Sequence, residues 1–200
     1  MIKTKKQLHD CLNVDSVNYI KRNTSFLKSF INDLATNPIS DQKYIWAYIK
    51  ELRYNEFYLN NSFLIKKKKN ILHKCYYTAL LIISNFKIKR LSYKTGFQIP
   101  PNVIDEGLTI WHYGYIIING ESHIGNKLTI YPGVEIGHKE PGGKCPIIGN
   151  NCFIGTGAKI FGGIHIGNNV TIAPNAVVVK DIPDNCVVAG VPAKIIKYKN

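Results

Sequence analysis

The stretch from residue 148 to residue 178 reads IGNNCF-IGTGAK-IFGGIH-IGNNVT-IAPNAV-V and places a branched aliphatic residue at every sixth position. The same series begins further upstream, and its members are Ile118, Ile124, Ile130, Ile136, Ile148, Ile154, Ile160, Ile166, Ile172 and Val178. Only Gly142 departs from it. That residue lies within Pro141-Gly142-Gly143, which predicts a loop that protrudes from the repeat.

A period of six matches neither an amphipathic helix nor an alternating strand. It predicts one short strand and one tight turn per hexapeptide, with three hexapeptides forming a triangular coil of about 18 residues. The inward aliphatic side chains then stack from coil to coil at about 4.8 Å, and Gly or Asn supplies positive φ at the corners. About five such coils fit between Val103 and Val188.

The charge of the chain divides it into two parts. The 200 residues carry a net charge of +13, but the first 95 hold 18 of the 26 basic residues and 6 of the 13 acidic ones. All 16 glycines follow Thr95. We therefore expect a basic α-helical region over 1–95 and a repeat domain with a short C-terminal tail over 96–200.

Apolar residues recur at helical spacing in the first part, around Leu8 to Ile20, Phe26 to Leu34, Tyr44 to Leu52 and Ile71 to Phe86. Ser40-Asp41 offers an N-cap for the third of these segments. No apolar run is long enough to span a bilayer, and no secretory signal follows the N-terminus. Five cysteines without a CxxC pair suit a reducing compartment, so we expect a cytoplasmic protein.

A basic run at 66–69, followed by Lys87, Lys89 and Arg90, has three interpretations. It forms a solvated face, or it contacts an anionic partner such as acidic lipid, a lipid-linked sugar or cofactor phosphates. Nucleic acid ranks last, because no nucleic-acid-binding motif accompanies the charge. Peripheral contact with an anionic membrane surface stays open.

The repeat resembles that of the hexapeptide-repeat acyltransferases, over roughly residues 96 to 197. Ile99-Pro100-Pro101-Asn102-Val103 and the segment 107–114 (GLTIWHYG) resemble the serine acetyltransferase branch, especially members found with surface-polysaccharide genes. The segment 189–194 (AGVPAK) resembles the closing segment of many acetyl-CoA users of this fold. The resemblance implies N-terminal helices followed by a left-handed parallel β-helix, a homotrimer with shared sites, and acetyl-CoA as co-substrate.

His112 interrupts the repeat. The step from Ile104 to Ile110 is six residues, whereas the step from Ile110 to Ile118 is eight, and Gly114 within it permits an unusual backbone. This irregularity, together with the family motif, indicates that His112 is catalytic.

The expected role of His112 is that of a general base, which removes the proton of an acceptor hydroxyl during attack on the thioester. No acyl-enzyme is required, so Cys145 and Cys152 are interpreted as structural. A backbone carbonyl would orient the imidazole. Glu121 and Glu135 are alternative partners, although each is expected to be an exposed charge.

The chain departs from the serine acetyltransferase motif at three places. Trp111 replaces the Asp before the histidine, the second acidic residue falls near Phe97 and is absent, and Cys145 replaces a second histidine. Lys144 keeps the charge of a neighbouring Arg, and His138 is a candidate to reach the acceptor across a subunit boundary. With Trp111, they form the expected acceptor-binding set, and the losses open the possibility of a sugar hydroxyl in place of L-serine.

The resemblance also implies a groove that binds coenzyme A. Backbone groups would make most of the contacts, and basic residues near the C-terminus would contact the phosphates. The expected residues of this groove are Thr156, Ala173, Pro174, Val179, Lys180, Lys194 and Lys197. No GxxxxGK phosphate loop and no metal-ligand spacing is present, so we expect no metal.

The sequence thus predicts an acetyl-CoA-dependent O-acetyltransferase acting on a hydroxyl of L-serine or of a surface-glycan sugar. Two alternatives remain: a non-catalytic trimeric scaffold, and an N-acetyltransferase that modifies an amino sugar.

Overall fold

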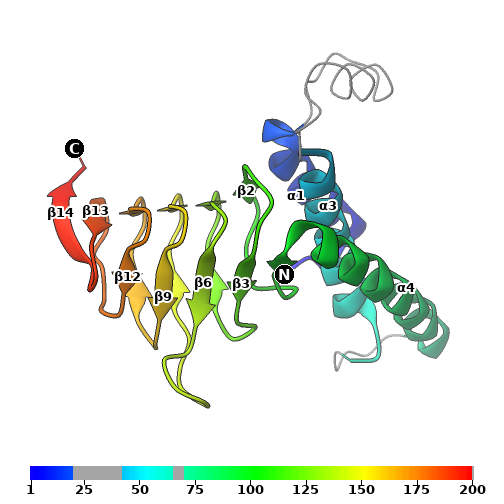
Figure 1. Cartoon of the computed structure of the whole chain (residues 1–200). Helices are drawn as coiled ribbons and strands as arrows, with labels where there is room; N and C mark the ends of the chain where they lie inside the picture. Colours follow the sequence, from blue (N-terminus) through cyan, green and yellow to red (C-terminus); the bar gives the residue numbers. More distant parts are fainter. Residues whose placement is uncertain (20–41, 65–69, 200) are drawn as a thin grey trace, which may run out of the picture.

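The computed structural model describes residues 1–19, 42–64 and 70–199. Helices lie at one end of a column of short strands, and the C-terminus lies at the other end (Figure 1). The expected helix around Phe26 to Leu34, the N-cap Ser40-Asp41 and the lysines at 66–69 fall outside the described residues.

The helical part contains α1 (Lys5–Asp15), a short 3-10 turn (Ser16–Asn18), α3 (Gln42–Asn61) and α4 (Ile71–Thr95). Thr4 caps α1 in a capping box with Gln7. The Asn70 side chain caps α4, which ends at Gly96 in the left-handed conformation. The helix predicted to end near Leu52 continues to Asn61, because α3 goes on to bury polar side chains there.

The repeat forms a parallel β-helix of three sheets. The first contains β1 (Phe97–Gln98), β3 (Ile116–Ile118), β6 (Val134–Gly137), β9 (Lys159–Phe161) and β12 (Val177–Val178). The second contains β4 (His123–Ile124), β7 (Ile147–Ile148) and β10 (His165–Ile166). The third contains β2 (Thr109–Ile110), β5 (Thr129–Ile130), β8 (Phe153–Ile154), β11 (Thr171–Ile172), β13 (Cys186–Ala189) and β14 (Lys194–Tyr198).

The registers confirm the period of six. Ile130 pairs with Ile154, which pairs with Ile172, and that residue pairs with Val188, so the aliphatic side chains stack in the buried interior. Each pairing is parallel except that of β14, which runs antiparallel to β13 and closes the column. The first sheet holds five strands, in agreement with the expected five coils.

Asparagine supplies much of the positive φ at the corners, as expected. Its positive-φ members are Asn102, Asn151, Asn169, Asn175 and Asn185. Asn side chains also form a ladder between coils: Nδ2 of Asn151 donates to Oδ1 of Asn169 (3.3 Å), and Nδ2 of Asn169 donates to Oδ1 of Asn185 (2.8 Å). The loop predicted around Gly142 protrudes between β6 and β7 (Figure 1).

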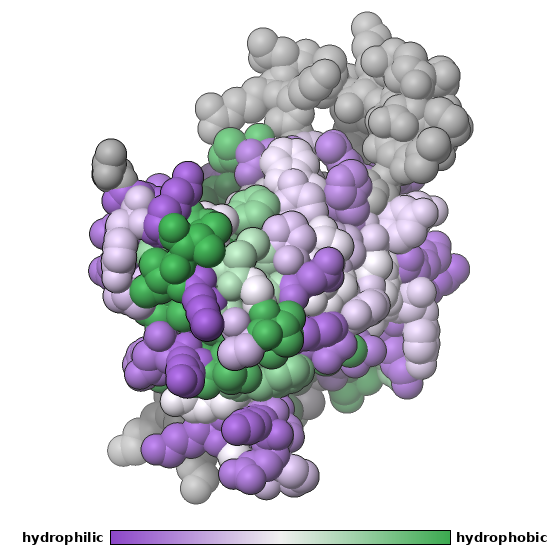
Figure 2. All heavy atoms as spheres, turned by 60° about the vertical axis from the view of Figure 1, so that its left-hand side comes forward, coloured by the Kyte–Doolittle hydropathy of each residue, from purple (hydrophilic) through white to green (hydrophobic). Residues whose placement is uncertain are grey.

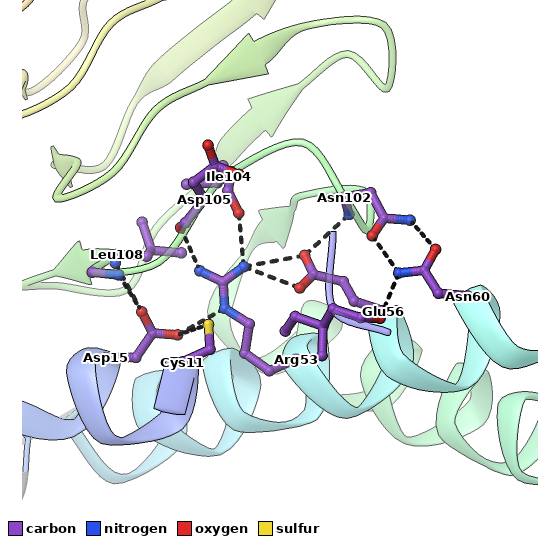
Figure 3. Close-up of polar contacts among 11 residues, drawn as sticks. Cys11, Asp15, Arg53, Glu56, Asn60, Asn102, Ile104, Asp105 and Leu108 are labelled. Atoms are coloured by element: carbon purple, nitrogen blue, oxygen red, sulfur yellow. Dashed lines mark hydrogen bonds and ion pairs between the residues drawn. The ribbon is translucent and has the colours of Figure 1, made fainter. Parts of the chain in front are cut away.

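A buried ionic network joins the helices to the first coil (Figure 3). Nε of Arg53 donates to Asp15 (2.7 Å), Nη1 donates to Glu56 (3.1 Å) and to the Ile104 carbonyl (2.7 Å), and Nη2 donates to the Asp105 carbonyl (2.8 Å). Ile45, Ile49 and Leu52 of α3 also share one apolar core with the coils. The division at residues 95 and 96 stays a prediction about domains, although α4 ends there.

Candidate functional site

His112 lies on a corner that holds two more residues than the next one. Residues 111–115 connect β2 to β3, whereas residues 131–133 connect β5 to β6, and the flanking strands are in register. The irregularity predicted from the repeat is therefore present, and His112 is exposed on it.

Gly114 shapes this corner. Its φ is +136°, its N–H donates to the Thr95 carbonyl (2.8 Å), and a Cβ added to it would lie 2.8 Å from Cβ of Pro132. Because only glycine adopts this backbone at so close an approach, the expectation of an unusual conformation here is confirmed.

One aromatic ring lies beside the imidazole, and a second packs on the first. The ring centroid of His112 lies 6.2 Å from that of Tyr131, which lies 5.4 Å from that of Phe153. Trp111 is half-buried and Tyr113 is exposed on either side of His112. The surroundings of His112 are thus rich in aromatic surface.

Several expected cofactor residues share the edge on which His112 lies. We call the corner between the third and first sheets the His112 edge; it carries His112, Pro132, Thr156 and Pro174 at equivalent positions of successive coils, because Ile110, Ile130, Ile154 and Ile172 are in register. The Thr156 carbonyl accepts from N–H of Asn175 (2.8 Å) on the next coil. With coils about 4.8 Å apart, Thr156 lies about 10 Å along the edge from His112.

The C-terminal segment ends this edge. Lys194 pairs with Ala189, which follows Val188 and corresponds to Ala173 one coil earlier. Lys197 pairs with Val187, further into the strand. Strand β14 combines two lysines with the exposed apolar side chains of Ile195, Ile196 and Tyr198, and Figure 2 shows hydrophilic and hydrophobic side chains side by side at this end of the molecule.

The remaining expected residues lie on a different corner. We call the corner between the first and second sheets the His138 edge; His138 follows β6, and Val179 and Lys180 follow β12. Lys144 is exposed on the protruding loop that starts there. A strand of the first sheet, about 13 Å long for four residues, separates this edge from the His112 edge. One chain therefore does not bring His112 together with His138 and Lys144.

The hydrogen bonds of His138 indicate its tautomer. Oδ1 of Asn119 accepts from N–H of Glu121 (2.9 Å), which directs its amide nitrogen toward Nδ1 of His138 (2.9 Å). Since the amide nitrogen donates, Nδ1 accepts and the ring proton is assigned to Nε2.

Sequence reasoning missed a charged pair on the first sheet. Nζ of Lys159 donates to Glu135 (2.7 Å), to the Tyr115 hydroxyl (3.0 Å) and to the Gly133 carbonyl (2.9 Å). Burial disfavours the charged ammonium, but the Glu135 carboxylate and the Tyr115 hydroxyl outweigh it and raise the pKa of Lys159. Glu135 is an alternative partner of His112 in the sequence analysis, but its carboxylate pairs with Lys159 in the structure. The sequence signal for this pair is the hexapeptide register, which places Glu135 and Lys159 at equivalent positions of neighbouring coils.

The two cysteines interpreted as structural are buried. Burial raises the pKa of both Cys145 and Cys152, so their thiols stay protonated and weakly nucleophilic at neutral pH. Within residues 1–19, 42–64 and 70–199, no group of three or more His, Cys, Asp or Glu side chains is placed to hold a metal ion.

The bacterial transferase hexapeptide family (six repeats) matches residues 145–180. The repeat is similar in sequence to parts of serine acetyltransferases. Serine acetyltransferase of Staphylococcus aureus is 40% identical over 134 residues, covering 64% of this chain and 61% of the relative. The enzyme of Synechococcus elongatus is 33% identical over 129 residues, covering 63% of this chain and 53% of the relative.

A solved structure agrees over nearly the whole chain. Serine acetyltransferase from Neisseria gonorrhoeae has a TM-score of 0.65 and 26% identity, with 98% of this chain and 67% of that chain covered. The architecture is N-terminal helices followed by a left-handed parallel β-helix. The chain spans about half to three-fifths of the length of the curated relatives it matches.

Proposed function

We propose that the protein is an acetyl-CoA-dependent O-acetyltransferase, with L-serine as the first acceptor to consider. The observation that carries the proposal is the position of His112, on the irregular corner of a serine acetyltransferase-like repeat and in line with Thr156 and Pro174. Solved serine acetyltransferases with a similar fold hold serine in one case and CoA in another.

His112 would act as the general base. Its neutral imidazole takes the proton of the acceptor hydroxyl as the oxygen attacks the thioester carbonyl. This attack forms the new C–O bond and a tetrahedral intermediate, whose collapse restores the carbonyl and breaks the C–S bond. The imidazolium then gives its proton to the departing thiolate, so the base is restored at the end of each turnover.

The His112 edge fits an elongated co-substrate. Exposed backbone and side chains of Thr156 and Pro174 follow His112 along the column, and Lys194 lies near its end. The four coil steps from Ile110 to Val188 span about 19 Å, so a thioester beside His112 would direct its phosphates toward Lys194. Lys ammonium groups are suitable partners of phosphates.

We propose further that the site is completed by a second copy in a homotrimer. His112 and His138 lie on different edges of the first sheet, so a neighbouring copy would have to bring its His138, Lys144 and Lys180 to this chain's His112 edge. Trp111 would contact the acceptor from the same corner as His112.

Cytoplasmic location is proposed from the cysteine pattern.

A sugar hydroxyl is the second candidate acceptor. Trp111, Tyr113, Tyr131 and Phe153 give the surroundings of His112 broad aromatic faces, and Trp111 stands where the motif of serine acetyltransferases carries an Asp. Flat apolar surface beside a few polar groups is typical of sites for ring-shaped ligands.

An acceptor panel tests the proposal. The full chain is incubated with acetyl-CoA and serine, hexoses or amino sugars, while CoA thiol release and product mass are followed. We expect an O-acetylated product with serine or a hexose. An N-acetylated product would support the amino-sugar alternative, and the absence of thiol release with every acceptor would support the scaffold alternative.

A further inference from the structure

Helix α4 has a second apolar face that the fold does not use. Its inner face, with Tyr77, Leu81 and Ser84, is buried beneath α3 and the helical core. On the opposite side of α4, side chains that follow one another at alternating steps of four and three residues form a stripe, which we call the outer face. Its large members are Leu72 (74% exposed), Tyr76 (59%), Ile83 (52%), Phe86 (73%) and Tyr93 (80%).

The charges that α4 itself contributes around this stripe have a single sign, although Glu51 of α3 lines a groove with Lys87 and Arg90. From Ile71 to Thr95 the helix contains five basic residues and no Asp or Glu. Lys87 and Lys89 lie on either side of the stripe just beyond Phe86, and Arg90 lies within it, one turn later. Among the described residues, no carboxylate comes within ion-pair distance of these three side chains. The outer face is therefore apolar toward its N-terminal half and basic toward its C-terminal half.

This combination selects the kind of partner. Two copies of α4 packed in parallel through this face would bring the basic halves together, and antiparallel packing would place each basic half on the apolar half of the other copy; both arrangements are unfavourable. A nucleic acid would pair with the lysines but would leave the apolar stripe exposed to water. An anionic lipid surface satisfies both halves, since apolar side chains enter the interface while Lys and Arg reach the headgroups with their aliphatic stems buried.

We propose that the outer face of α4 docks the protein on an anionic lipid surface. The helix lies along the membrane plane, because its inner face stays packed against α3. Leu72, Tyr76, Ile83 and Phe86 enter the headgroup–acyl boundary, and Lys87, Lys89 and Arg90 contact lipid phosphates. The His112 edge belongs to the β-helix and does not take part, so docking is separate from the proposed acetyl transfer.

Co-sedimentation with vesicles tests the proposal. The full chain is mixed with vesicles of phosphatidylcholine and phosphatidylglycerol, and with vesicles of phosphatidylcholine alone. We expect binding to the anionic vesicles that weakens as salt is added. The double variant Lys87→Gln/Lys89→Gln should bind about 25-fold more weakly, because each basic group near the surface contributes about fivefold, which corresponds to about 1 kcal/mol.

The double variant Ile83→Ser/Phe86→Ser tests the apolar half. It should bind the anionic vesicles at least about tenfold more weakly, because two apolar side chains would no longer be buried in the lipid. Lys5→Gln/Lys6→Gln on α1 is the matched control, since it makes the same charge change on exposed lysines outside the face. Circular dichroism checks that every variant is folded.

Three results would overturn the proposal. The first is equal binding to neutral and anionic vesicles, or none. The second is equal weakening by the α1 control and by the α4 variants. The third is a drop in oligomer mass for Ile83→Ser/Phe86→Ser, measured by analytical ultracentrifugation, without any change in vesicle binding, which would assign the face to a second copy.

Discussion

At the scale of single residues, the candidate site depends on one corner of the β-helix. Two additional residues between Ile110 and Ile116 lengthen this corner, and His112 is exposed on it. A repeat that stacks one aliphatic layer on the next leaves little room for a reactive side chain in its interior. An insertion at a corner supplies such a position without disturbing the stacked core.

Gly114 should be the residue of this corner least tolerant of substitution. Gly114→Ala requires an L-residue at φ +136° and places Cβ 2.8 Å from Pro132. We expect a loss of about 1–3 kcal/mol in the free energy of unfolding, measured by urea denaturation.

Gly142→Ala is the matched control for Gly114→Ala. Gly142 also has positive φ (+75°), but an added Cβ would meet no atom within 4 Å. Gly142→Ala should lower the free energy of unfolding less than Gly114→Ala does, since only the backbone cost of about 1 kcal/mol applies. Equal losses for the two variants would show that the contact with Pro132 carries no weight.

At the scale of elements, Arg53 connects α3 to both α1 and the first coil. Its guanidinium is 1% exposed and its donors reach Asp15, Glu56 and two backbone carbonyls. Asp15 in turn accepts from N–H of Gly107 (2.6 Å) and Leu108 (3.0 Å). The helical part is thus fixed on the coil that precedes His112.

Removal of that guanidinium should be strongly destabilising. Arg53→Met leaves two buried carboxylates without their cation, and we expect a loss of about 3–5 kcal/mol in the free energy of unfolding. The exposed Arg90→Met should change it by no more than about 0.5 kcal/mol. A small effect of Arg53→Met, similar to that of Arg90→Met, would contradict the role given to the network.

A feature can be predicted from the sequence when the residues that form it are close together in the chain. The six-residue period predicts the β-helix and the His112 corner, because each signal lies within a few residues. The Arg53 network was missed, since it joins Arg53 to backbone atoms of Asp105, and no local pattern reveals such a contact. The sequence analysis makes His138 a candidate to act across a subunit boundary, but it does not predict that His112 and His138 lie on opposite edges of the first sheet. That separation follows from the way three strands close each coil.

At the scale of the whole molecule, two surfaces are separated. The basic residues are concentrated in the helices, where α4 presents its outer face, whereas the β-helix carries the His112 edge and is nearly neutral. The helices lie at one end of the column (Figure 1). Docking by the outer face of α4 would leave the His112 edge open to its substrates.

The free energy of unfolding should decrease at alkaline pH, because two buried groups of the helices would lose protons. Burial raises the pKa of Cys11 from 9.0 to about 12, and burial also raises that of Tyr48 from 10.0 to about 12. The unfolded chain loses these protons at a lower pH than the folded chain. The contribution of the two groups to the free energy of unfolding is therefore complete below pH 9 and is lost as the pH rises toward 12. Urea denaturation between pH 8 and pH 11, under reducing conditions, measures this loss.

Two cysteine variants identify the groups behind this pH dependence. Cys11→Ala should make the decline in stability with pH shallower, because one of the two groups no longer titrates. Cys75→Ala should leave the slope unchanged, since Cys75 is exposed. An unchanged slope in Cys11→Ala would mean that other groups determine the alkaline limit.

The most direct test of the proposed chemistry is the rate of CoA release from acetyl-CoA by three proteins, measured with the best acceptor of the panel. These are the wild type, His112→Ala and His165→Ala; His165 is exposed on β10, away from the His112 edge. We expect a fall in kcat of about 10²–10⁴ for His112→Ala, the contribution of a general base, and wild-type turnover for His165→Ala. Equal kcat in the wild type and His112→Ala would contradict this role of His112.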